Sequence, residues 1–132
     1  MDFYVPTRDE ILEAVQAQSA PLVFDSPHSG TWHPPDFAFV CDKQRLRRAE
    51  DTYVDALWAA APNAGCGYLR AFFPRSYIDP NRAVTDIDET LFEAQWPDHV
   101  NPSEKSKAGM GLILSLIHIY EPTRHTSQSR IA

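Results

Sequence analysis

The sequence is poor in several features that would define a class of protein. Its 12 Lys and Arg residues are outnumbered by 18 Asp and Glu and form no single run, so a net charge of −6 argues against a nucleic-acid partner. The only two cysteines, Cys41 and Cys66, form no C-x-x-C pair, which argues against a disulfide framework and a thiolate zinc site. No apolar run is long enough to span a bilayer, and the N-terminus lacks the basic end and apolar run of a signal peptide. These absences predict a soluble, cytoplasmic protein with no membrane partner.

The chain is organised around Leu22 to Gly30, which reads LVFDSPHSG. The apolar residues 22–24 predict a buried strand of a parallel sheet, and the Ser, Pro and Gly residues that follow predict a turn. His28 lies at the tip of that turn. Because ligands of open α/β sheets bind beyond the carboxyl ends of the strands, His28 is a candidate site residue. The alternative is a loop histidine satisfied by water or a backbone carbonyl.

The flanking segments predict the rest of an α/β unit. Thr7 to Glu10 has the form of a capping box, so a helix is expected to run from there to about Ala17. A long helix is expected from the N-cap Asp42 to about residue 61, followed by a second core strand over 67–73. Strand, helix and strand in this order predict two parallel strands. The predicted fold class is therefore α/β, with a mostly parallel sheet and flanking helices, in a chain of 132 residues and 43% apolar content.

The predicted long helix carries an acidic pair on its buried side. Glu50 falls inside the apolar stripe and Asp51 lies at its edge; the stripe consists of Leu46, Ala49, Tyr53, Leu57 and Ala60. A carboxylate aimed at a core is costly unless a cation or several donors compensate it. Three interpretations of Glu50 stay open: an ion pair with Arg47 or Arg82, a protruding and solvated helix end, or ligation of a metal together with His28. Imidazole and carboxylate are a common pair of zinc ligands.

A second polar turn, Pro74 to Arg82 (PRSYIDPNR), follows the second predicted strand and should leave the same edge of the sheet. Arg75 and Arg82 are each suited to grip a carboxylate with two parallel hydrogen bonds, and Asn81 adds a neutral donor. The turn therefore suits a small anionic molecule. The alternative is an arginine held by Asp79 or Asp86 to stiffen the loop.

Four separated segments, SPHSG, LRRAEDTYVD, FPRSYIDPNR and NPSEKSKAGMGLI, resemble the N-formylglutamate amidohydrolase family, the bacterial deformylases of histidine degradation. The likeness runs from about Leu22 to Ile113. It implies a phosphorylase/hydrolase-like α/β fold related to zinc carboxypeptidases and aspartoacylases, with one zinc ion. The implied reaction is hydrolysis of the formamide C–N bond of N-formyl-L-glutamate to formate and L-glutamate.

The resemblance also implies roles for individual residues. His28 would be one zinc ligand, and either Glu50 or Asp51 would be another. The YIDPNR segment is similar to the DLNR-type segment of aspartoacylases, which implies that Asn81 and Arg82 hold the substrate carboxylate. By the same likeness, Arg75 would polarise the scissile carbonyl or stabilise its oxyanion.

The chain departs from the family pattern beyond Ile113. Residues 1–113 are expected to be the N-terminal part of an amidohydrolase-like domain, and 114–132 to be a non-native tail, because Leu114 to Arg124 resembles a translated sequencing-adaptor tract. His118 and His125 are then accidental. With only two of the usual three protein ligands for catalytic zinc, the fragment is expected to be inactive, and its uncovered core surface predicts poor solubility.

Two other functions fit the same residues. One is a related zinc amidase or carboxypeptidase-like enzyme that acts on another N-acyl amino acid or on a peptidoglycan peptide. The other is a non-catalytic module that uses Arg75 and Arg82 to hold an acidic ligand without metal.

Overall fold

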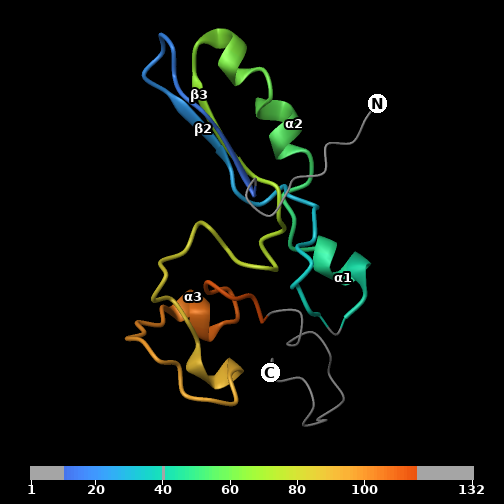
Figure 1. Cartoon of the computed structure of the whole chain (residues 1–132), viewed down its shortest axis with the longest axis vertical. Coiled ribbons are helices and arrows are strands. Elements are labelled where there is room, and N and C mark those ends of the chain that lie inside the picture. The colour runs from blue at the N-terminus through green and yellow to red at the C-terminus, as the bar shows by residue number, and fades with distance from the viewer. Residues whose placement is uncertain (1–10, 40, 116–132) are drawn as a thin grey trace.

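The computed structural model describes residues 11–39 and 41–115 and is an α/β fold, as predicted. A small sheet with α2 lies at the top of Figure 1, and α1, α3 and long loops lie below it. The elements in chain order are β1 (Leu12–Val15), β2 (Val23–Ser26), α1 (Lys43–Arg47), α2 (Val54–Trp58), the 3-10 turn η1 (Ala61–Ala64), β3 (Gly67–Ala71), the 3-10 turn η2 (Glu89–Leu91) and α3 (Glu104–Lys107). Within the described ranges, no helix has the length and apolar character needed to cross a membrane.

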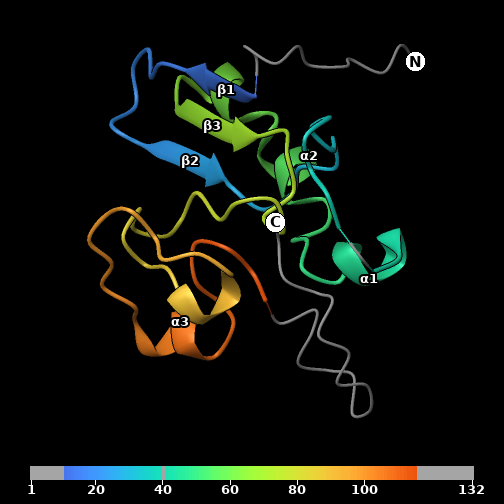
Figure 2. The ribbon, with the colours of Figure 1, turned by 60° about the horizontal axis from the view of Figure 1, so that its bottom comes forward.

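The sheet has the strand order β1-β3-β2, so β3 lies between the other two strands (Figure 2). β2 pairs with β3 in parallel, with Phe24 opposite Tyr68, which confirms the predicted parallel pair. β1 pairs with the other edge of β3 in the antiparallel direction, with Leu12 opposite Ala71. The sheet of the described strands is therefore mixed and not mostly parallel.

The helix predicted to run to about Ala17 is wrong where the structure describes it, because residues 12–15 form β1. Three residues of its supposed helical face, Leu12, Ala14 and Val15, belong instead to an edge strand, and the fourth, Ile11, directly precedes that strand. Pairing with the free edge of β3 satisfies the backbone groups of both segments, and this tertiary gain outweighs a weak local helix preference. The capping box at 7–10 lies outside the described residues.

The long helix predicted over 42–61 is wrong as well, because it is broken into α1, α2 and η1. Tyr53 has a φ of 68°, in the left-handed region, which ends any continuous helix at that point. The predicted buried stripe is wrong for the same reason: Leu46 is buried, but Tyr53 and Leu57 are 75% and 71% exposed. The break leaves residues 48–53 free to cross the His28 turn, where the Asp51 N–H donates to the His28 carbonyl at 3.0 Å.

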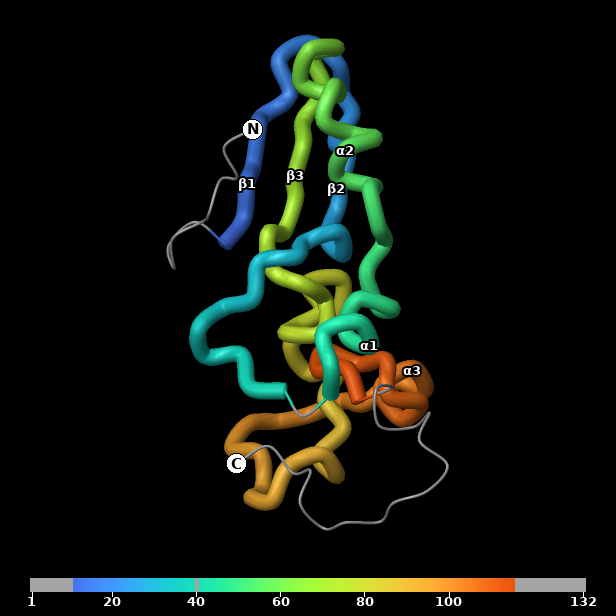
Figure 3. Tube along the Cα trace, turned by 90° about the vertical axis from the view of Figure 1, so that its right-hand side faces the viewer, coloured from blue at the N-terminus to red at the C-terminus, as the bar shows by residue number. Residues whose placement is uncertain are grey.

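The two faces of the sheet differ in how far other parts of the chain cover them. On one face α2 runs along β2 and β3 (Figure 3), with the Phe24 and Trp58 ring centroids 4.7 Å apart. The strand register places Leu12, Ala14, Val23 and Leu69 on the opposite face. Val23 is 69% exposed there, on an edge strand, so we expect it to favour association between chains.

We expect Val23→Lys to leave the free energy of unfolding unchanged within about 0.5 kcal/mol, because an exposed side chain contributes little packing. The same substitution should raise the soluble yield and lower the fluorescence of a bound apolar dye. Phe24→Lys is the matched control on the same strand, since it removes the Trp58 contact and should cost more than about 1.5 kcal/mol in urea unfolding. Equal destabilisation by the two variants would contradict the assignment of faces.

The lower part of the molecule anchors the loop that follows β3. Ser103 caps the N-terminus of α3: its hydroxyl accepts from the Ser106 N–H, and its own N–H donates to Asp86 at 2.8 Å. Leu112 then bridges two parts of the loop, because its N–H donates to the Asp86 carbonyl and its carbonyl accepts from the Asp79 N–H, both at 2.8 Å. These bonds connect the backbone of Asp79 to that of Asp86 through Leu112.

Candidate active site

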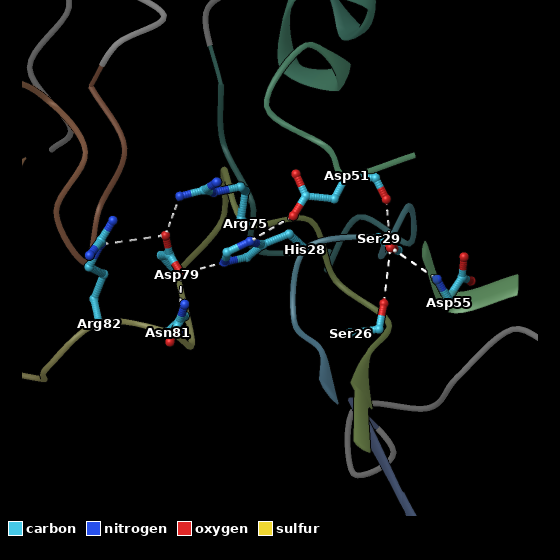
Figure 4. Close-up of polar contacts among 9 residues, drawn as sticks. All are labelled: Ser26, His28, Ser29, Asp51, Asp55, Arg75, Asp79, Asn81 and Arg82. Carbon is cyan, nitrogen blue, oxygen red and sulfur yellow. Dashed lines mark hydrogen bonds and ion pairs between the residues drawn. The ribbon is translucent and has the colours of Figure 1, made fainter. Parts of the chain in front are cut away.

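His28 lies in a buried position between two carboxylates (Figure 4). Its Nε2 is 2.8 Å from Asp79 Oδ1, and its Nδ1 is 3.2 Å from Asp51 Oδ2. The turn after β2 carries the histidine, the break before α2 carries Asp51, and the loop after β3 carries Asp79. The structure thus brings together the ends of three segments, and His28 is not a solvent-satisfied loop residue.

Asp79 is the centre of the site, with no exposed side-chain surface. Besides His28, its carboxylate accepts from Arg75 Nη2 at 2.6 Å and from the Asn81 N–H at 2.9 Å, and lies 3.8 Å from Arg82 Nε. Burial alone would raise the pKa of Asp79, but the hydrogen bonds from His28 and from the Asn81 backbone, with the charges of His28 and Arg75, lower it below its ordinary value. Asp79 is therefore held as a carboxylate.

The contacts of His28 indicate which ring nitrogen carries the N–H when the imidazole is neutral. Carboxylates only accept hydrogen bonds, and a neutral imidazole carries one N–H. The shorter contact, to the fully buried Asp79, is where that N–H belongs, so a neutral ring has a bare Nδ1 facing Asp51 Oδ2. Two acceptors in contact call for either a second proton on the ring or a cation between them.

The structure separates the two acidic candidates of the predicted helix. Asp51 contacts His28, whereas Glu50 pairs with Arg47 Nε at 3.1 Å. The Glu50 side chain is only 2% exposed, so the solvated interpretation is wrong and the Arg47 interpretation is confirmed. Glu50 Oε1 is buried and has no hydrogen-bond partner in the described part of the chain, and ligation of a metal by either carboxylate stays a prediction.

Arg75, Asn81 and Arg82, predicted from one loop, do come together, and they do so around Asp79 (Figure 4). The interpretation of arginines held by Asp79 is therefore observed for both, while Asp86 bonds Ser103 instead. The two arginines differ in how tightly they are held. Arg75 makes a short bond at 2.6 Å, but Arg82 Nε is 3.8 Å from the carboxylate and makes no hydrogen bond to any residue that the structure describes. Arg82 is the more available of the two for an anionic ligand.

The donor set fits part of a zinc site. No group of three or more His, Cys, Asp or Glu side chains in 11–39 and 41–115 is arranged to hold a metal ion. The pair His28 Nδ1 and Asp51 Oδ2, however, converges at 3.2 Å. Ligands that each lie about 2.0–2.2 Å from a tetrahedral zinc ion are separated by roughly that distance. The carboxylate of Asp79 on the other ring nitrogen is the usual partner of a metal-binding histidine.

Two residues of the site were missed as functional residues by the sequence reasoning. Asp79 was considered only as an anchor for arginine, although its place between two arginines in PRSYIDPNR marks it as the charge that must balance them. Ser29 was considered only as a turn residue. Its hydroxyl contacts Asp51, which is distant in sequence, so no local signal identifies it.

Comparisons with known proteins identify the family to which the chain is similar. Residues 20–132 match the family model described as FGase, N-formylglutamate amidohydrolase. A crystal structure of N-formylglutamate amidohydrolase from Ralstonia eutropha JMP134 is similar, with 47% sequence identity, a TM-score of 0.73 and 85% of this chain covered. No curated protein matches the chain.

The family match and the crystal structure place the chain among the amidohydrolases, a class of hydrolases. It belongs to the N-formylglutamate amidohydrolase family, as the sequence motifs predicted. The chain spans 39% of the length of the Ralstonia eutropha protein. The predicted boundary at residue 113 stays a prediction, and His118 and His125 lie outside the described residues.

Proposed function

We propose that this chain supplies part of an active site that hydrolyses the formamide C–N bond of N-formyl-L-glutamate with the help of one zinc ion. The observation that carries the proposal is His28 held between Asp51 and Asp79 beside two arginines, in a member of this family. The proposal includes a fold related to zinc carboxypeptidases and a cytoplasmic location.

Nδ1 of His28 and a carboxylate oxygen of Asp51 would hold the zinc, with the buried Glu50 as the alternative carboxylate. When bound, zinc supplies Lewis acidity, which polarises the formyl oxygen and lowers the pKa of water. Asp79 keeps the proton of His28 on Nε2 and so leaves Nδ1 free to bind. The short bond from Asp79 also fixes the direction of Arg75, whose charge would face the developing oxyanion.

Arg82 and Asn81 would hold the carboxylate of the substrate. The ion pair between Arg82 and Asp79 is long, so a substrate carboxylate could replace it at little cost. The carboxylate would then accept two parallel hydrogen bonds from the guanidinium group of Arg82. Among residues 11–39 and 41–115 no general base and no third metal ligand is assigned, so the chain alone is expected to be inactive.

A chimaera tests the activity: the matched part of this chain replaces the corresponding part of the Ralstonia eutropha protein. We expect it to release formate from N-formyl-L-glutamate. Because both groups would bind the metal, His28→Ala and Asp51→Ala should each lower kcat/KM by at least about 100-fold. Arg82→Lys should act mainly on KM, since lysine lacks the planar fork.

Glu104→Gln is the matched control, because that carboxylate is exposed on α3 and, within the described residues, forms an ion pair with Lys107 alone. It should leave kcat/KM unchanged. If the chimaera is active and His28→Ala leaves its kcat/KM unchanged, the proposal is wrong. Preference for acetylated or peptide substrates over the formylated one would favour the related-amidase alternative.

Zinc titration of the chain itself separates the enzyme from a metal-free binding module. With two ligands we expect weak but measurable binding that disappears in His28→Ala. Binding of glutamate that is lost in Arg82→Ala, with no zinc binding at all, would favour the module.

A further inference from the structure

Ser29 lies next to His28 and makes three polar contacts through one hydroxyl group (Figure 4). The hydroxyl donates to the Asp51 carbonyl at 2.7 Å and accepts from the Asp55 N–H at 3.3 Å. It also accepts from the Ser26 hydroxyl at 3.0 Å. Both serines are buried, so water does not compete for these contacts. One donor and two acceptor sites are the full capacity of a hydroxyl group, and all are used.

These contacts hold Asp51 by its backbone on both sides. The Asp51 carbonyl is held by Ser29, and the Asp51 N–H donates to the His28 carbonyl at 3.0 Å. The side chain of Asp51 is 55% exposed, and among the described residues its carboxylate has a polar side-chain contact with His28. A half-exposed side chain is little restrained by packing, so its position depends on where its backbone is fixed.

The backbone that follows Asp51 is in an unfavourable conformation. Tyr53 has a φ of 68°, which costs a bulky residue about 1–2 kcal/mol, and it precedes α2 without a side-chain cap. The Ser29 contacts to Asp51 and Asp55 lie on either side of this residue. They are placed to hold the strained segment in the course that brings Asp51 to His28.

We infer that Ser29 is a positioning residue that sets the separation of His28 Nδ1 and Asp51 Oδ2. The expected effect of Ser29 on zinc affinity rests on the proposed function, in which His28 and Asp51 bind zinc. The expected effect of Ser29 on the separation of the two side chains does not depend on metal. A merely structural role, in which Ser29 fastens α2 to the turn, predicts loss of stability alone. Positioning predicts an effect that acts through the Asp51 carboxylate.

The first test is zinc affinity of the whole chain, measured by competition with a chromophoric chelator. Ser29→Ala should weaken binding about 10- to 100-fold, as loss of a supporting hydrogen bond at a metal site does. Ser26→Ala keeps the Ser29 bond to Asp51 and should weaken binding less than about 3-fold, on the same scale. Ser76→Ala is the control, because Ser76 is buried and its hydroxyl has no hydrogen-bond partner among residues 11–39 and 41–115.

An Asp51→Ala background separates positioning from stability. If Ser29 acts through Asp51, Ser29→Ala should not weaken zinc binding further in that background, although it should still lower the midpoint of urea unfolding. An equal loss of affinity in both backgrounds would overturn the inference. Ser29→Cys keeps a weaker donor of similar size and should be intermediate, and it serves if the alanine variant does not fold.

The second test needs no metal. Long-range proton–nitrogen NMR spectra of the histidine rings report the surroundings of His28 Nδ1, with His28→Ala giving the assignment. In Ser29→Ala this resonance should move toward its position in Asp51→Ala. A shift without any zinc binding by the wild type would uphold the positioning role and defeat the zinc proposal. A resonance that stays at its wild-type position would defeat the role of Ser29.

Discussion

Asp79→Ala is expected to lower the free energy of unfolding by about 3–5 kcal/mol, the range seen when one partner of a buried ion pair is removed. The substitution leaves Arg75 and Arg82, both mostly buried, without their shared counter-charge. It also leaves His28 Nε2 without its acceptor. Urea unfolding at neutral pH measures the change, which should be among the largest of any single charged residue in the chain.

Two further variants give that result its meaning. Asp79→Asn keeps an acceptor for His28 and Asn81 but loses the charge, so its destabilisation should be smaller than that of alanine. Glu104→Gln removes an exposed charge on α3 and should cost less than about 0.5 kcal/mol. A loss below about 1 kcal/mol for Asp79→Ala would show that the arginines find other partners or water.

The sequence predicted the parallel strand pair because apolar runs bounded by proline and glycine identify buried strands. It failed for β1, since an edge strand is chosen by the free backbone groups of β3, a tertiary effect that residues 11–17 do not encode by themselves. The prediction of a continuous helix also failed at Tyr53. The residues around it favour a helix by composition, but Tyr53 has a left-handed backbone conformation that interrupts it. Nothing local marks that break, because its stabilising contacts come from His28 and Ser29 in a distant turn.

The residues of the candidate site were predicted more completely than the helices and strands that carry them. His28, Asp51, Arg75 and Arg82 were identified from residue chemistry and motif likeness, and the structure brings them into one cluster. The choice between Glu50 and Asp51 was beyond a helical projection, because the helix on which it was drawn does not exist. The role of Asp79 as the partner of His28 was not predicted for a related reason. The two residues lie 51 positions apart in the sequence, and only the folded chain brings them into contact.

Gly30→Ala is expected to destabilise the chain by at least about 3 kcal/mol, the upper end for overpacking, because the new methyl group meets backbone that has no room to move. A Cβ at residue 30 would lie 2.2 Å from the Phe73 carbonyl oxygen and 2.4 Å from the Phe72 carbonyl. The Trp32 N–H donates to Phe72 at 2.9 Å, so the two strand-end segments run in direct contact here. Forcing them apart should also separate His28 from Asp79, and zinc affinity should fall with stability.

Gly65→Ala is the matched control, because it also creates a close contact but of another kind. Its Cβ would lie 2.1 Å from Ser19 Oγ, the end of a side chain, and its φ of 77° adds about 1–2 kcal/mol of backbone strain. Adding Ser19→Gly should recover the part of the loss caused by the contact. No side-chain truncation offers the same recovery at Gly30, where the opposing atoms are carbonyl groups of the chain itself. If Gly30→Ala proves no less stable than Gly65→Ala, the two strand-end segments are not in direct contact, and the cluster around His28 is not held by that contact.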